Sequence, residues 1–207
     1  MSAPPRIYLW PDRFLYLGPS FDTACHRHHA AQLLVGLDAG FRLRGGPKQS
    51  WLELDSALID TDTPHMADAT GTDMAALYIE PESAVYAALQ QSKHLAKHLA
   101  RHQTKTSPAP GLEAYFVTPS LRQKLAQYRV QGADCKQARE LCLALLQLTQ
   151  EPQTPPQHDP RVDAALIRIR SGYDGLDDLA RQVHLSPSRL AHLFREETGV
   201  AIRRYAL

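Results

Sequence analysis

The chain has 207 residues, of which 43% are hydrophobic and 22% charged, and this composition excludes a largely disordered protein. Its 23 Lys and Arg against 22 Asp and Glu give a formal net charge of +1, which excludes a general polyanion-binding surface, so any nucleic-acid contact must be local. The start lacks a signal-peptide pattern, no apolar run has the length of a membrane span, and the three cysteines frame no disulfide scaffold. We therefore expect a cytoplasmic protein of one or two domains without a membrane partner.

Residues 1–80 are predicted to form an antiparallel β-barrel. Short apolar runs alternate there with breaks rich in Gly, Pro and Asp, where Gly permits positive φ and Pro removes a donor from the hydrogen-bond ladder. Many short strands at this spacing are typical of a compact barrel or sandwich. The predicted strands are 7–10, 14–17, 32–37, 41–43, 51–54, 57–59 and 74–79.

Residues 81–150 are predicted to be helical, because the period of the apolar pattern changes from 2 to about 3.6 after Pro81. Segment 133–150 is apolar on more sides than one packing stripe requires. We expect this helical region to form a homodimer, with packing on the barrel as the alternative. Three histidines at helical spacing are interpreted as a solvated face: His94, His98 and His102.

Residues 151–160 contain four prolines, which exclude a helix and predict an extended linker between two domains. Beyond the linker, the pattern predicts three short helices at 161–170, 176–183 and 187–199. The last follows an N-cap, Ser186, and has Pro187 at its first position. Because a tight turn joins the second and third helices, the sequence predicts a helix-turn-helix.

The third predicted helix has an outward face that is small, polar and rich in hydrogen-bond donors. Its apolar residues share one side of a helical wheel, and the opposite side carries Ser188, Ala191, His192 and Arg195, with Arg189 beside them. Such a face can enter the DNA major groove. A solvated helix face is the alternative, since eight Arg against six acidic residues leave residues 161–207 only slightly positive.

A resemblance to a known family rests on this segment. From Leu176 to Phe194 the chain reads L-x-x-L-A-x-x-V-x-L-S-P-S-x-L-x-x-x-F, followed by Gly199 and by Arg204-Tyr205. This pattern resembles the first helix-turn-helix of the AraC-type transcription regulators, in which a cupin-like effector domain precedes the DNA-binding domain. The strand-then-helix order predicted above agrees with that architecture.

The resemblance implies an α+β fold, a cupin-like effector-sensing barrel in residues 1–80, a helical dimerisation region in 81–150 and a DNA-binding domain in 161–207. It also implies DNA and a small-molecule effector as partners, and no enzymatic activity. The residues that it places near bases are Ser188, Ala191 and His192, with Pro187 and Arg189 adjacent, and Arg195 corresponds to a phosphate contact.

The family's DNA-binding domain holds a second helix-turn-helix, and this sequence departs from that pattern. The chain stops at Leu207, where the helix that connects the two motifs begins. We interpret the chain as a truncated form, and one motif makes few phosphate contacts. We therefore expect DNA binding that is weak and has little sequence preference.

Several histidines of the predicted barrel resemble the ligand set of the cupins. His26-x-His28 with Gln32 resembles the first cupin motif, and His65 stands where the second motif supplies a histidine. If a strand runs on from Cys25, its period of 2 puts His26 and His28 on one side and His29 outward. Two imidazoles, an amide oxygen and His65 can then hold a divalent metal.

Two other interpretations of these histidines stay open: they line a pocket for an organic effector, or they are structural. Gln32 replaces the Glu that catalytic cupins usually carry, and a neutral amide is the weaker ligand. The rival function from another class is a metal-dependent cupin enzyme, an oxygenase or isomerase that uses His26, His28 and His65. The missing Glu and the intact turn around Ser186 favour the regulator.

Overall fold

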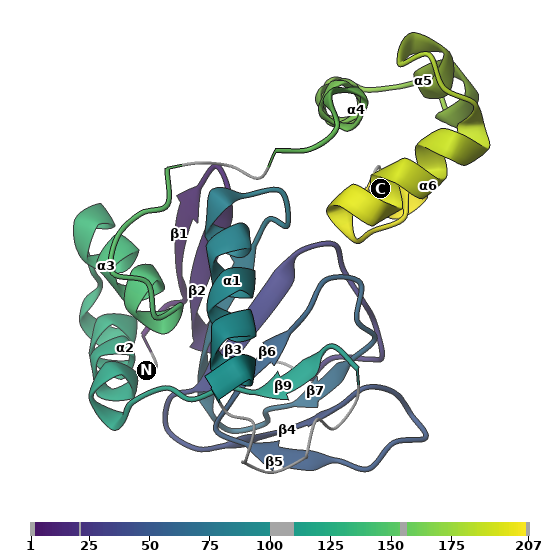
Figure 1. The fold of residues 1–207 in the computed structure, drawn as a ribbon. Coiled ribbons are helices and arrows are strands. Elements are labelled where there is room, and N and C mark those ends of the chain that lie inside the picture. The colour runs from purple at the N-terminus through teal and green to yellow at the C-terminus, as the bar shows by residue number, and fades with distance from the viewer. Residues whose placement is uncertain (1–2, 21, 100–109, 154–156, 206–207) are drawn as a thin grey trace. The chain divides into compact units, whose positions relative to one another are not determined.

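A computed structural model describes residues 3–20, 22–99, 110–153 and 157–205, with side chains left undescribed from 93 to 99 (Figure 1). The chain divides into two compact units, Met1–Thr154 and Pro155–Leu207. The boundary falls inside the predicted linker, 151–160. Within the described ranges, no helix combines the length and apolar character that crossing a membrane requires.

The first unit contains two antiparallel sheets. The larger has the order β1 (Arg6–Trp10), β2 (Arg13–Pro19), β8 (Asp73–Ile79), β3 (Ala31–Gly36), β6 (Ser56–Ile59) and β9 (Leu112–Ala114). The smaller has the order β5 (Leu52–Leu54), β4 (Phe41–Arg44) and β7 (Met66–Asp68). The antiparallel β-structure is thus confirmed, although β7 and β9 were not predicted, because a strand of three residues is too short to show a period.

Three helices accompany the sheets: α1 (Ala84–Leu99), α2 (Pro119–Gln131) and α3 (Cys135–Leu145). The helix expected over 133–150 ends at Leu145, and α2 lies within the region predicted to be helical, although its bounds were not predicted. A local pattern marks the start of α2: the side chain of Thr118 accepts a hydrogen bond from the backbone N–H of Leu121, and Pro119 follows this N-cap.

The apolar residues of α3 that exceed one packing stripe are largely buried inside the first unit. Leu141, Cys142, Leu145 and Leu146 are buried against the larger sheet in one core cluster. Residues 81–150 therefore share a core with the larger sheet, and β9 from the same region pairs with β6. Packing on the barrel accounts for the residues that suggested a dimer, so the homodimer stays a prediction.

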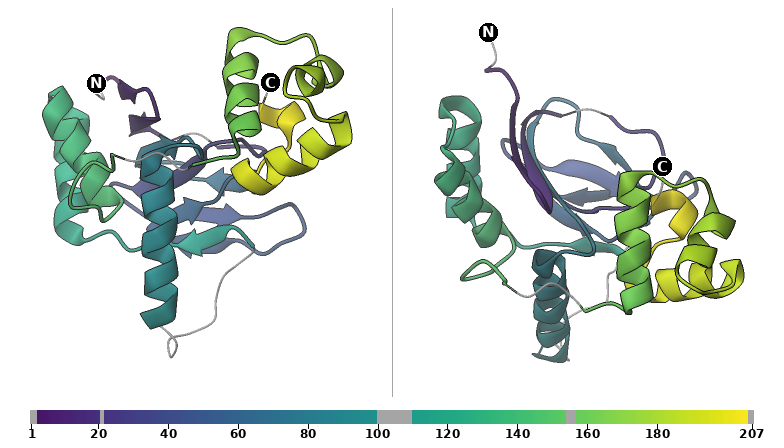
Figure 2. Two further views of the ribbon diagram at one scale, coloured as in Figure 1. Left: turned by 45° about the horizontal axis from the view of Figure 1, so that its top comes forward. Right: turned by 90° about the horizontal axis from the view of Figure 1, so that it is seen from above.

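Alternation along the central strands separates two apolar layers. Both views of Figure 2 show α2 and α3 side by side at the edge of the first unit, next to the N-terminal strands. On β3, Leu33 and Val35 belong to the core shared with the helices, whereas Leu34 belongs to the core between the two sheets. β8 alternates in the same way, and Tyr78 packs on the inter-sheet side. Because successive side chains of a strand point to opposite faces, Gln32 shares the inter-sheet side with Leu34.

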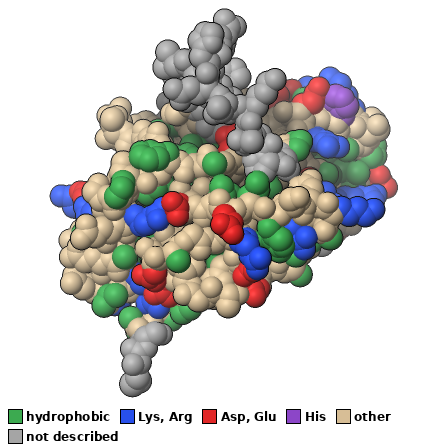
Figure 3. Space-filling view, turned by 90° about the horizontal axis from the view of Figure 1, so that it is seen from below, with side chains coloured by type: hydrophobic (Ala, Val, Ile, Leu, Met, Phe, Trp, Pro, Cys, Tyr) green, Lys and Arg blue, Asp and Glu red, His purple; other side chains and the backbone are tan. Residues whose placement is uncertain are grey.

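The second unit consists of α4 (Pro160–Ser171), α5 (Leu176–Gln182), α6 (Pro187–Thr198) and α7 (Ile202–Tyr205). The first three lie where they were predicted, with ends that differ by a single residue. Their apolar faces meet in a separate core that contains Val162, Leu179, Leu190 and Phe194. On the face of the molecule in Figure 3, basic and acidic described side chains are interspersed, in line with the net charge of +1.

Candidate functional site

The three histidines predicted as ligands come together. His26 and His65 form an isolated antiparallel bridge, with backbone N···O distances of 2.9 and 2.8 Å. Their ring centroids are 4.2 Å apart, and the ring of His28 lies 5.0 Å from that of His65. Each ring offers a nitrogen, and the three nitrogens lie within 4.8 Å of one another. His65 is buried, whereas His26 and His28 are half-buried, so the cluster opens on the side of these two rings.

The local structure around these residues differs from the expectation. Residues 25–30 form no strand: His26 makes an isolated bridge with His65, and the backbone oxygen of His28 accepts a hydrogen bond from the N–H of Asp62 at 3.0 Å, but no continuous ladder forms. His26 and His28 still converge on His65 without regular strand geometry. His29 does not face outward: its side chain is 17% exposed, and its Nε2 lies 2.9 Å from Oε1 of Glu82.

Backbone carbonyls determine which nitrogen of each ring is free. Nδ1 of His26 lies 2.9 Å from the oxygen of Ala24, Nδ1 of His28 lies 2.7 Å from that of Ala30, and Nδ1 of His65 lies 2.8 Å from that of Thr63. A carbonyl oxygen only accepts, so each Nδ1 carries the proton and each Nε2 keeps its lone pair. Metal-ligating histidines are commonly oriented by such a second hydrogen bond.

Gln32 adds an oxygen to the same cluster. Its Nε2 donates to the hydroxyl of Tyr78 at 2.6 Å, which turns its Oε1 toward His28, 3.2 Å from Nε2 of that ring. The side-chain amide of Gln32 thus lies beside the imidazole of His28. The residues present therefore fit a divalent metal with three imidazole nitrogens and one amide oxygen. Tyr78 was missed from the sequence, although its inward position on β8 follows from the strand period.

The adjoining cavity is small. Its volume is about 50 Å³, and its lining includes Gln32, Leu34, His65, Ala67, Met74 and Tyr78. A water molecule occupies about 30 Å³ in the liquid, whereas ligand pockets usually measure about 300 Å³ or more. The cavity suits an ion with a bound water, and an organic effector would need a larger opening.

Burial favours the neutral forms of His28 and His65 by lowering the pKa of both rings, and this predicts a dependence of stability on pH. Burial lowers the pKa of His65 to about 4 and also lowers the pKa of His28. The unfolded chain binds the proton of His65 near pH 6.5, whereas the folded chain binds it only near pH 4, so the unfolded state holds more protons in this window. The metal-free protein should therefore lose about 3 kcal/mol of unfolding free energy through His65 as the pH falls from 6.5 to 4.

Urea unfolding of chelator-treated protein across this pH range measures the effect. A His65→Gln variant, which cannot titrate there, is the control and should show a clearly shallower decrease. Equal slopes in the two proteins would contradict the assignment of the pH dependence to His65.

The ends of α6 are determined by local chemistry. Oγ of Ser186 accepts a hydrogen bond from the backbone N–H of Arg189 at 3.2 Å, and Pro187 occupies the first helical position. At the other end, Gly199 has a φ of 76° and donates its backbone N–H to the oxygen of Arg195 at 3.0 Å. The turn before α6 contains His184 at a φ of 55°, in the left-handed region.

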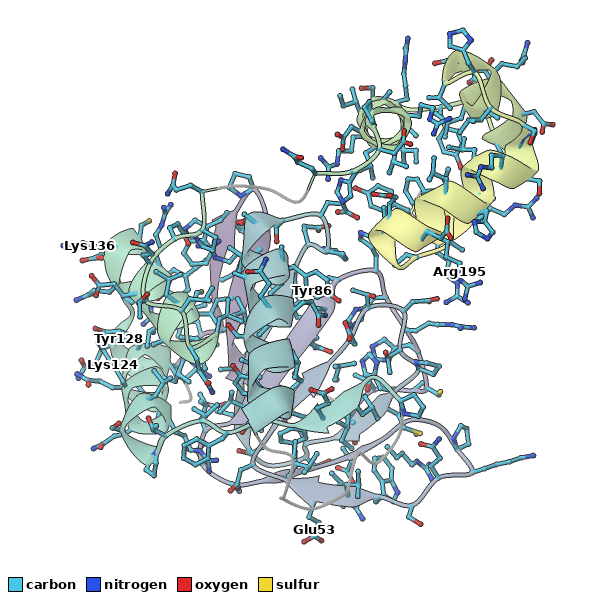
Figure 4. All side chains as sticks on the ribbon, in the orientation of Figure 1. Glu53, Tyr86, Lys124, Tyr128, Lys136 and Arg195 are labelled. Carbon is cyan, nitrogen blue, oxygen red and sulfur yellow. The ribbon has the colours of Figure 1, made fainter. Side chains whose placement is uncertain are left out.

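The predicted DNA-contacting residues share the surface of α6. Pro187 and Ala191 are half-buried, and the others, Ser188, Arg189, His192 and Arg195, are exposed. Figure 4 shows Arg195 projecting outward from the helix. His192 Nδ1 lies 2.9 Å from a carboxylate oxygen of Glu196, so one acidic group sits among these donors. His94, His98 and His102 fall outside the described side chains.

Comparisons with known proteins give structural neighbours only. No family model and no curated protein matches the chain. The AraC-like transcriptional activator CuxR matches 98% of this chain and 76% of its own, at 11% identity and a TM-score of 0.41. Apo ToxT K231A from Vibrio cholerae strain SCE256 matches 100% of this chain and 97% of its own, at 9% identity and a TM-score of 0.39.

A cupin domain from Bordetella pertussis Tohama I matches 38% of this chain and 92% of its own, at 16% identity and a TM-score of 0.28. The neighbours thus include AraC-like regulators over nearly the full chain and a cupin over part of it. At such identities and TM-scores, these likenesses carry no argument about function.

Proposed function

We propose that this chain is a DNA-binding transcription regulator whose barrel senses a divalent metal ion or a small ligand bound to it. The observation that carries the proposal is the exposed donor face of α6, a capped helix that belongs to a separately folded helical unit. We assign base contacts to Ser188, Ala191 and His192, adjacent positions to Pro187 and Arg189, and a phosphate contact to Arg195.

The packing of the second unit supports this assignment. Leu190, Leu193 and Phe194 are buried, so α6 cannot rotate about its axis without exposing its apolar face. The opposite face is therefore held outward. A helix about 10 to 12 Å across fits the major groove, which is about 12 Å wide.

The sensing role of the barrel is supported by the four donors His26, His28, Gln32 and His65. Three Nε2 lone pairs and one amide oxygen attract a cation, and the cavity of about 50 Å³ beside them leaves room for a small ligand. A bound divalent ion would supply positive charge to the inter-sheet space. An organic effector at this cluster is the alternative, and it requires the cavity to widen.

Three further parts of the proposal follow the sequence rather than the geometry. The protein acts as a homodimer, responds to a small-molecule effector, and is not an enzyme. A metal-dependent cupin oxygenase or isomerase is the rival function, because the same histidines that would sense a metal can also support chemistry on it.

The DNA contacts predict two different effects of mutation. In a chain extended by a second helix-turn-helix, which should bind with sequence preference, His192→Ala and Ser188→Ala should relax discrimination at particular base pairs by about 1 to 3 kcal/mol, because a lost base contact affects one position of the site. Arg195→Ala should weaken binding to all sequences alike and lower the salt dependence by about one phosphate contact. Binding selections on randomised duplexes at one fixed salt concentration measure the base preferences, and affinities at several salt concentrations measure the salt dependence.

Lys136→Ala is the matched control for loss of a positive charge, because Lys136 is exposed on α3 in the first unit (Figure 4). It should change neither the preferred sequence nor the affinity by more than about twofold. If the variants at positions 188 and 192 keep the sequence preference of the parent chain, the assignment of α6 as the recognition helix fails.

A further inference from the structure

We propose that His29, Glu80 and Glu82 form a second divalent-metal site, distinct from the three-histidine cluster, which joins the loop before β3 to the turn that begins α1. The three side chains come from two segments about fifty residues apart in the sequence. They meet because β3 and β8 are paired with Ala31 opposite Ile79. His29 precedes β3 and Glu80 follows β8, so both residues lie at the same end of this ladder.

The separations between the donor atoms match those around a metal ion. Nε2 of His29 lies 2.9 Å from Oε1 of Glu82 and 3.7 Å from Oε2 of Glu80, and one donor atom from each of the three residues lies within 4.8 Å of the others. Donors bound to zinc at about 2.1 Å are roughly 3 to 4 Å apart, depending on the angle at the ion. The three side chains therefore need only small rotations to share one ion.

Backbone hydrogen bonds hold the segment that carries the two glutamates. The N–H of Glu80 donates to the oxygen of Asp12 at 2.9 Å, and the N–H of Ser83 donates to the oxygen of Glu80 at 3.1 Å. Pro81, between the two glutamates, has a restricted φ. Tyr86, labelled in Figure 4, lies in the first turn of α1 and marks the end of the helix at which Glu82 stands. The backbone of the segment that carries both glutamates is thus held in place before any ion binds.

Burial divides the site into an inner pair and an outer ligand. The side chain of Glu82 is 6% exposed and that of His29 is 17% exposed, whereas Glu80 is 44% exposed. A buried carboxylate is costly unless a positive charge or several hydrogen bonds compensate it. An ion would be held by His29 and Glu82 from inside and would enter from solvent past Glu80.

The three side chains together carry a net negative formal charge. Their formal charge is −2 with a neutral imidazole and −1 with an imidazolium, so a divalent cation brings the set closest to neutrality. One nitrogen and two carboxylate oxygens suit Zn²⁺ or Mn²⁺, with water at the remaining positions. This donor set is harder than the three imidazoles of the first cluster, so the two sites are expected to differ in their preference between these metals.

The test is a count of bound ions in the full chain. After treatment with a chelator, the protein is dialysed against Zn²⁺ or Mn²⁺ alone, and the ratio of metal to protein is measured by elemental analysis. The unmodified chain should bind two ions, Glu82→Gln one and His65→Ala one. Glu53→Gln, an exposed change of the same charge on β5 (Figure 4), should still bind two.

The outcomes separate the two sites. If Glu82→Gln binds as many ions as the unmodified chain, or if the unmodified chain binds none, the second site is refuted. If the unmodified chain binds one ion that His65→Ala retains and Glu82→Gln loses, the second site is confirmed and the three-histidine site fails. Should Glu82→Gln not fold, Glu80→Gln on the exposed side of the site should raise the dissociation constant at least about tenfold, and an unchanged constant would refute the site.

Discussion

His65→Ala should abolish tight metal binding at the three-histidine cluster. His65 is the most buried of the three rings, at 1% exposed, and its Nδ1 is oriented by the backbone oxygen of Thr63. Changes to outer-shell partners alone cost about 10 to 100-fold in metal affinity, so loss of a ligand should cost more than about 100-fold. Titration with Zn²⁺ in the Glu82→Gln background isolates this cluster from the second proposed site.

The metal should also stabilise the folded chain. A ligand present at about 100 times its dissociation constant raises the unfolding free energy by about 2.7 kcal/mol, and the His65→Ala variant should show no such gain. Gln32→Glu is the complementary variant, because a carboxylate in place of the amide should bind the ion more tightly. His192→Ala, a histidine change in the second unit, is the control and should leave both effects intact.

A metal-dependent shift in stability that survives in His65→Ala would contradict the assignment of the site. So would a Gln32→Glu variant that binds metal no better than the unmodified chain. Either result would favour the structural or organic-effector interpretations of these histidines.

Phe194→Ala should unfold the second unit while leaving the first unit folded. Phe194 is fully buried in the core of the helical unit, and its ring contacts Tyr205 edge-on at a centroid distance of 5.4 Å. Removing a buried Phe costs about 3 to 5 kcal/mol, which is close to the total stability of a domain as small as residues 155–207. The first unit has its own cores and does not depend on this ring.

Far-ultraviolet circular dichroism and thermal unfolding measure the outcome. The variant should lose helical signal and retain one cooperative transition from the first unit. Arg195→Ala, an exposed change on the same helix, is the control and should preserve both transitions. If Phe194→Ala instead lowers the stability of the whole chain in a single step, the two units do not fold independently.

Local chemistry was enough to predict the second unit. Ser186, Pro187 and Gly199 each act within a few residues, through a side-chain cap, a preset φ and a left-handed φ, and α6 begins and ends beside them. The same logic could have found α2 from Thr118 and Pro119. The histidine cluster also followed from the sequence, since both motif segments were identified and the structure brings them together.

Only the tertiary structure decided which surface covers the apolar faces of segment 133–150. The sequence showed that segment 133–150 is apolar on several sides, but periodicity cannot say which surface packs against it. In the fold, Leu141 and Leu145 are covered by the larger sheet of the same chain. The prediction of a subunit interface therefore loses its supporting observation. The prediction of the fold class does not depend on that observation.

The sequence by itself determined most strands of the first unit, the three longer helices of the second unit and the identity of the metal-ligand candidates, because these depend on patterns within a few residues. Only the tertiary structure decided the position of His29. A strand period from Cys25 placed this residue outward, but residues 25–30 form no strand, and the register of β3 on β8 brings His29 to Glu80 and Glu82. Contacts between segments fifty residues apart are determined by strand pairing and packing, and no local pattern records them.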